Sequence, residues 1–184
     1  MTGLLVVIVA GAIVVWLVAV YNRLVRLQNM VREGWSGIDV QLKRRADLIP
    51  NLVETVKGYL SHEQNVLHEV TTLRTQSLTA GGAAEKGRVE GLLSKALGNL
   101  FAVAESYPDL KANQNFLELQ GRLAELEEQI QLARRYFNGA VRNLNIQVES
   151  FPSNLVARMF GFESSEYFEL TSPEDSTVPG VAFK

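Results

Sequence analysis

The first twenty residues constrain this chain more than any other part of it. They contain no ionisable side chain, and the 17 residues from Leu4 to Val20 are all apolar or small. As a helix this run would be about 25 Å long, at the short end of what crosses the hydrocarbon core of a bilayer. Trp16 and Tyr21 lie toward its C-terminal end, where interfacial aromatic residues are expected. We therefore predict a transmembrane anchor over residues 1–21.

A cleaved secretory signal is the alternative interpretation of the same run. No basic side chain precedes it, however, and the triplet Ala10 to Ala12, its one small-x-small sequence, lies inside it. Arg23, Arg26 and Arg32 follow the run, so the positive-inside rule predicts a single-pass protein of the cytoplasmic (inner) membrane with its body in the cytoplasm. The opposite topology stays open, because these arginines also suit the solvent face of a following helix.

Composition narrows the class of protein. The 184 residues are 47% hydrophobic, which suits one domain with a real core. A net charge of −2 gives no basic field for nucleic acid, so no nucleic-acid partner is expected. Cysteine is absent, which excludes disulfides, thiolate nucleophiles and lipid-modified cysteines.

Apolar residues recur at steps of three or four along most of the chain, as is typical of amphipathic helices. After the anchor they are Leu24, Leu27, Val31, Trp35, Ile38, Leu42, Ile49, Val53, Val56 and Leu60. Similar stripes predict helices over about 87–105 and 112–149, and SLTAGGAA at 77–84 predicts a loop. Gly34 and Gly37 beside Trp35, and later Gly87, Gly91 and Gly98, indicate close packing of a neighbouring element. The sequence thus predicts an all-α bundle over 22–170 and, from its polar composition, a flexible tail over 171–184.

The stretch RRADLIPN, residues 44–51, admits two structures. In the favoured one a helix ends at Arg44 and Arg45 and another begins with Asp47 as its cap and Pro50 in its first turn. Both helix dipoles would then be stabilised by about 0.3–1 kcal/mol. The alternative is one long helix kinked at Pro50, since the apolar stripe keeps its phase across the proline.

The same stretch also suggests an enzyme, in which Asp47 or Glu54 acts as acid or base and Arg44 or Arg45 binds an anion. A capped corner with a solvated basic face accounts for these residues without chemistry, and Asn51 can bond to backbone there. We therefore predict no catalytic residue.

The two histidines do not form a recognisable metal motif. His62 and His68 are six residues apart, which puts them on opposite sides of a helix. The residues three before them are Tyr59 and Asn65, not the glutamates of a di-iron bundle. We expect no metal and no cofactor, with a metal- or ligand-binding site around His62, Glu63 and His68 as the alternative.

The end of the last long helix is marked by Phe151 and Pro152. Ser153 is predicted to cap a short amphipathic helix through Phe160, rich in large apolar groups that continue to Phe162. We predict that this segment packs on the bundle as a lid. A second membrane contact or a subunit interface is the alternative.

Four separated blocks carry a resemblance to the LemA family. They are YNRLVRLQNMVREGWSGIDVQLKRRADLIPNLVETVKGY from residue 21, HE at 62–63, FNGAVRNLN at 137–145 and FPSNLVARMFGF at 151–162. The resemblance reaches from the membrane run to about Phe168 and implies a membrane-anchored, up-and-down four-helix bundle with long helices, without a defined reaction. Some relatives carry a lipoprotein cysteine in place of the anchor, and a branch of the family is associated with magnetosome membranes.

Together these observations predict a non-enzymatic, self-assembling scaffold or membrane-organising module. Its expected partners are the lipid bilayer, further copies of the chain and other membrane proteins. The alternatives are a membrane-tethered metal- or ligand-binding protein or enzyme, and an adaptor that recruits a membrane protease through residues 172–184. The residues singled out for structure or interaction are Trp35, Arg44, Arg45, Asp47, Pro50, Asn51, Phe151, Pro152, Phe160 and Phe162.

Overall fold

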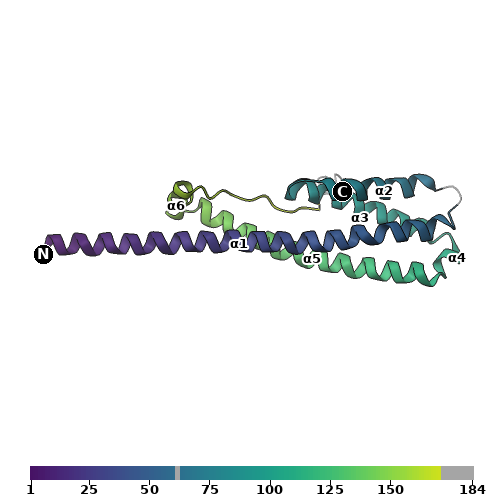
Figure 1. Cartoon of the computed structure of the whole chain (residues 1–184), viewed down its shortest axis with the longest axis horizontal. Helices are drawn as coiled ribbons and strands as arrows, with labels where there is room; N and C mark the ends of the chain where they lie inside the picture. Colours follow the sequence, from purple (N-terminus) through teal and green to yellow (C-terminus); the bar gives the residue numbers. More distant parts are fainter. Residues whose placement is uncertain (61–62, 171–184) are drawn as a thin grey trace, which may run out of the picture. The chain divides into compact units, whose positions relative to one another are not determined.

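The structure, a computed structural model, describes residues 1–60 and 63–170, and these form helices and no strand. The helices are α1 (Thr2–Lys57), α2 (Gln64–Thr79), α3 (Ala83–Ala104), α4 (Pro108–Lys111), α5 (Gln114–Glu149) and α6 (Ser153–Phe160), shown in Figure 1. The predicted all-α class is confirmed, and α3 and α5 match the helices predicted at 87–105 and 112–149. The predicted loop at 77–84 is shorter, because α2 continues to Thr79 and α3 begins at Ala83. The predicted tail at 171–184 lies outside the described residues.

The predicted corner near Pro50 is wrong, because α1 continues through it as one helix (Figure 1). Proline has no N–H, so within a helix it leaves the carbonyl four residues earlier, here that of Ala46, without its usual donor. Arg74 of α2 supplies the replacement: its Nε donates to the Ala46 carbonyl oxygen at 3.0 Å. A side chain 28 residues away thus repairs the hydrogen bond that Pro50 removes. Asp47 lies in the middle of the helix and is exposed, so it caps nothing.

The start of α5 is fixed by a side-chain cap. The Asn113 side-chain oxygen accepts hydrogen bonds from the backbone N–H groups of Asn115 at 2.9 Å and Phe116 at 3.2 Å. These two donors have no partner within the helix, so the cap satisfies groups that would otherwise need water.

The short α6 has the predicted bounds but not the predicted cap. The Ser153 hydroxyl donates to the carbonyl oxygens of Gln147 at 2.7 Å and Ser150 at 2.9 Å, at the end of α5. Ser153 therefore ties α6 to the helix before it, instead of satisfying the first N–H groups of α6. Gly161 ends α6 in the left-handed region at φ 71°, a conformation that glycine adopts without strain.

The chain divides into two compact units. Unit 1 comprises Met1–Ile38 and Leu132–Tyr167, and unit 2 comprises Asp39–Gln131 and the chain from Phe168. A core cluster of unit 1 contains Val20, Leu24, Leu144, Val156 and Ala157. A core cluster of unit 2 draws on α1, α2, α3, α4 and α5, and its members include Ile49, Leu52, Val56, Val70, Leu93, Leu100, Leu110, Phe116 and Leu123. The up-and-down order of a four-helix bundle stays a prediction.

Gly34 and Gly87, two of the five glycines expected at close contacts, do lie at one, and the expectation for Gly91 stays a prediction. A Cβ at Gly34 would come within 3.0 Å of the Phe137 Cα, so α1 and α5 approach closely there. A Cβ at Gly87 would collide with the backbone of Glu169, so the chain after α6 lies directly against α3. Gly37 and Gly98 face open space, and the prediction is wrong for them.

Candidate functional site

A buried arginine stands at the centre of the polar interactions in unit 2. Arg45 of α1 is 1% exposed, and its Nη1 donates to the Ser94 hydroxyl at 2.8 Å and to Glu127 Oε2 at 2.6 Å. Its Nη2 donates to the carboxylate of Glu90, whose other oxygen accepts from the Ser77 hydroxyl. We call Arg45, Ser77, Glu90, Ser94 and Glu127 the arginine centre. It links α1, α2, α3 and α5.

Burial differs sharply between the two carboxylates of this centre. Glu90 is fully buried, whereas the Glu127 side chain is 38% exposed. Moving an ion out of water costs several kcal/mol, so Glu90 depends on the cation beside it, while water solvates much of Glu127. One guanidinium and two carboxylates leave the centre with an excess of negative charge, which disfavours a bound anion. The Arg45 Nε has no hydrogen-bond partner within the described residues.

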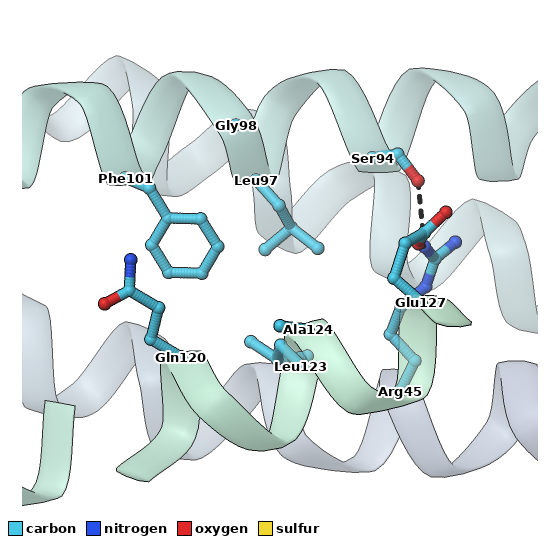
Figure 2. Close-up of a pocket in the computed structure, with 9 residues that line it drawn as sticks. All are labelled: Arg45, Ser94, Leu97, Gly98, Phe101, Gln120, Leu123, Ala124 and Glu127. Carbon is cyan, nitrogen blue, oxygen red and sulfur yellow. Dashed lines mark hydrogen bonds and ion pairs between the residues drawn. The ribbon is translucent and has the colours of Figure 1, made fainter. Parts of the chain in front are cut away.

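A cavity of about 400 Å³ adjoins the arginine centre. Figure 2 shows Arg45, Ser94 and Glu127 at one end of it and Phe101 and Gln120 at the other. Its remaining lining is apolar or small, namely Leu97, Gly98, Leu123 and Ala124. Ser94 meets a cation rather than a base, so nothing described here would take its proton and make it a nucleophile. The arrangement suits holding helices together better than bond-making.

The residues predicted to form the corner are not brought together into a site. Arg44, Asp47 and Asn51 are exposed on α1, and Pro50 is exposed beside the Arg74 contact. Arg45 alone points into the core.

The aromatic residues singled out from the sequence, together with Pro152, lie in unit 1. Trp35 packs against Phe137, with ring centroids 5.5 Å apart. Phe160 and Phe162 both contact Tyr21 edge-on. Phe151 and Pro152 are exposed before α6. The lid prediction therefore describes only one face of this segment, because Val156 and Ala157 are buried whereas Phe151 and Phe160 are exposed.

The histidine region gives no metal geometry in the part of the chain that is described. His68 lines a cavity of about 400 Å³ with Asn65, Glu69, Thr72, Leu73 and Leu92. His62 lies outside the described residues. Within residues 1–60 and 63–170, no group of three His, Asp or Glu side chains is placed to hold a metal ion.

Glu63, the remaining residue of the histidine region, accepts a hydrogen bond from a tyrosine. The Tyr107 hydroxyl donates to Glu63 Oε1 at 2.6 Å. This hydrogen bond is the main reason that the pKa of Tyr107 is raised above its ordinary value of 10.0, with burial and the negative charge of Glu63 adding to it. The contact joins the segment before α2 to the turn before α4.

Sequence reasoning missed four members of the arginine centre and Arg74. A signal for the centre was present: Glu90 falls on the helical stripe that continues through Leu93, Leu97 and Leu100. A charged residue on an apolar stripe must be buried with a partner or distort the helix.

Comparison with known proteins gives consistent matches. The sequence model of the LemA family matches residues 34–183. Magnetosome protein MamQ 2 of Paramagnetospirillum magneticum is 24% identical over 184 aligned positions, which cover 86% of this chain and 68% of that protein. Magnetosome protein MamQ of Magnetospirillum gryphiswaldense is 23% identical with the same coverage. Protein LemA of Metamycoplasma hominis is 25% identical over 154 positions, covering 83% of this chain and 70% of that protein.

Proposed function

The chain belongs to the LemA family, and we propose that it acts as a membrane-anchored helical scaffold that self-associates and performs no reaction of its own. The N-terminal part of α1 anchors it in the cytoplasmic membrane, and an up-and-down bundle forms the body. The arginines that follow the anchor favour a cytoplasmic body. The observation that carries self-association is a stripe of exposed apolar residues along α5.

The anchor is supported by the burial pattern along α1. Residues 1–19 are exposed except for the half-buried Leu17, and the first buried residue of α1 is Val20. The helix is long and apolar enough there to cross a membrane. A core helix of a soluble protein has the same composition but is covered by other residues. An apolar helical segment with so little protein cover needs another apolar environment, and a bilayer provides it.

The stripe on α5 consists of the exposed Leu132, Tyr136 and Ile146 and the half-buried Gly139. Leu132 is 52% exposed, Tyr136 46% and Ile146 55%. Leu132, Gly139 and Ile146 are spaced by seven residues, the heptad spacing at which helices pack along a seam. A Cβ at Gly139 would meet nothing, so a partner backbone can approach closely there.

A second copy of the chain is the partner that best fits this stripe. Copies anchored in one membrane hold their α5 stripes at the same height, so identical stripes can meet in register. Anchoring also confines the copies to two dimensions and raises their effective concentration. Weak apolar contacts then suffice for assembly.

Disulfide crosslinking in native membranes tests this proposal, because the chain has no cysteine of its own. Gly139→Cys places a thiol on the stripe, and Gly121→Cys is the matched control on the same helix, where a Cβ also faces open space. We expect an oxidant to give a dimer band with Gly139→Cys and not with Gly121→Cys. Adding Leu132→Lys and Ile146→Lys should abolish that band.

A strictly monomeric protein would refute the proposal. This outcome requires no crosslink from Gly139→Cys in membranes and a single monomer mass in mild detergent. Metal analysis of the same purified protein addresses the metal-binding alternative, because a scaffold has no use for a stoichiometric transition metal.

A further inference from the structure

The short helix α6 has both buried and exposed apolar residues. Val156 and Ala157 are buried against the core of unit 1. Leu155 and Met159 each lie about 160° around the helix from Ala157, at about 100° per residue, and are 55% and 69% exposed. Phe151, four residues before Leu155, is 80% exposed. We call Leu155 and Met159, together with Phe151 in the turn before the helix, the outer face of α6.

The position of α6 along α1 is fixed by aromatic contacts. The Tyr21 ring packs edge-on against Phe160, with centroids 4.9 Å apart, and against Phe162 at 5.8 Å. Val20 and Leu24 of α1 share a core cluster with Val156 and Ala157. Tyr21 directly follows the exposed apolar run of α1, and its contacts with Phe160 and Phe162 place α6 beside that part of the helix; Figure 1 shows α6 beside α1. The outer face of α6 therefore lies where the anchor enters the body of the protein.

We propose that α6 is an interfacial helix, whose outer face inserts into the surface of the same bilayer that α1 crosses. This inference rests on the anchor of the proposed function and adds a second lipid contact to it. Leu155, Met159 and Phe151 lie at the boundary between headgroups and acyl chains, where amphipathic helices bury their apolar side. Tyr21 and Phe160 lie at the same level, which is where aromatic side chains concentrate.

Three cations near α6 suit a phospholipid surface, and the exposed carboxylates of Glu149 and Glu163 flank the same segment. Arg158, which is exposed, is the single charged residue in α6, and Arg23 and Arg26 are exposed on the first turns of α1 after the anchor. All three are cations, and they adjoin an apolar face at the level of the lipid phosphates. Arginine binds phosphate through several donors, and its apolar stem can remain among the acyl chains. A membrane that contains anionic lipid is thus the expected occupant.

Site-directed spin labelling of the full chain tests the proposal. Single cysteines replace Leu155 and Met159, with Val14 as the control inside the anchor. Ser36 is the aqueous control, because it is exposed on α1 and lies about 22 Å beyond Tyr21 at 1.5 Å per residue. Each labelled protein is reconstituted in vesicles of phosphatidylcholine with phosphatidylglycerol. The accessibility of the label to oxygen, which concentrates in lipid, is compared with its accessibility to a water-soluble nickel complex.

Labels at 155 and 159 should be more accessible to oxygen than to nickel, with a ratio between those at Val14 and Ser36. If the ratio at both equals that at Ser36 while Val14 lies in lipid, the anchor holds and the interfacial helix is refuted. Protection of both labels from both reagents would also refute it, because a protein partner would then cover α6. An aqueous label at Val14 would overturn the anchor itself.

Discussion

Replacing Arg45 by methionine should destabilise the fold strongly, because it leaves the fully buried Glu90 without its cation. The Ser77 hydroxyl would remain as the hydrogen-bond donor to its side chain, and one hydroxyl cannot compensate a buried carboxylate. Removing one partner of a buried ion pair costs about 3–5 kcal/mol. For a chain of this size, each kcal/mol lowers the melting temperature by about 2–4 °C, so the expected loss is about 6–20 °C.

Two further variants make this expectation specific to the buried pair. Arg45→Met combined with Glu90→Leu removes both charges and should recover most of the loss, since apolar replacement of a buried pair is often neutral or stabilising. Glu127→Gln is the control for the exposed pair. Glu127 Oε2 lies 2.6 Å from Arg45 Nη1, but the Glu127 side chain is 38% exposed. The substitution should therefore lower the free energy of unfolding by at most about 1 kcal/mol.

Circular dichroism at 222 nm of the full chain in mild detergent measures these differences during heating. The anchor should stay helical in the micelle, so the signal change reports the body of the protein. A fall of less than about 2 °C for Arg45→Met would refute the reasoning. So would a double variant as unstable as Arg45→Met alone, because the penalty would then not come from the unpaired Glu90.

Three other predictions concern contacts between residues that lie far apart in the sequence. Gly87→Ala should lower the free energy of unfolding by about 1–3 kcal/mol in thermal unfolding, because the added Cβ meets the Glu169 backbone. Gly98→Ala on the same helix is the control: its Cβ faces open space, so it should raise the free energy of unfolding by up to about 1 kcal/mol. Arg74→Met should lower the free energy of unfolding by about 1–3 kcal/mol, as measured with denaturant. The loss should be clearly smaller in a Pro50→Ala background, where the restored backbone N–H of residue 50 donates to the Ala46 carbonyl. Equal losses in both backgrounds would show that Arg74 does not replace the hydrogen bond that Pro50 removes. Because the pKa of Tyr107 is raised in the folded protein, its hydrogen bond to Glu63 contributes fully to folding stability below the unfolded pKa near 10.0. That contribution is lost as pH rises through the higher folded pKa. Wild type should therefore lose stability relative to Tyr107→Phe above about pH 10, and an absorbance titration near 295 nm should show one late-titrating tyrosine that the variant lacks.

The long helices could be predicted because their signal is local and repeated. Leu119, Leu123, Leu126 and Ile130 follow one another at helical steps within α5, and such a run needs no information from elsewhere in the chain. The end of one helix at Arg44 and Arg45, with Pro50 in the first turn of the next, was predicted from the same kind of local signal, and it was wrong. The donor that lets α1 continue comes from Arg74, and no local pattern links position 74 to the carbonyl of Ala46.

The arginine centre was partly visible in the spacing of the apolar stripes. On α1 the stripe predicted from the sequence passes from Leu42 to Ile49 in one step of seven residues. A residue in the middle of such a step lies on the same face, and Arg45 stands there. On α3, Glu90 stands at the start of the stripe that continues through Leu93, Leu97 and Leu100. The pairing could not be predicted, because stripes show which face is buried and not which residues of different helices meet.

Departures from the amphipathic pattern therefore carry most of the information about what a residue does. A charged residue on a buried face and an apolar residue on an exposed face have different meanings. A charged residue on a buried stripe, such as Arg45, can stay there only if other helices bring partners to it, so it fixes which helices pack together. An apolar residue on an exposed face, such as Leu132 of α5 or Met159 of α6, leaves surface that the folded chain does not cover. The first kind of departure is satisfied within the chain, whereas we propose that the second is satisfied outside it. The arginine centre therefore serves stability, and our proposals give the α5 stripe a second copy of the chain and the outer face of α6 the membrane.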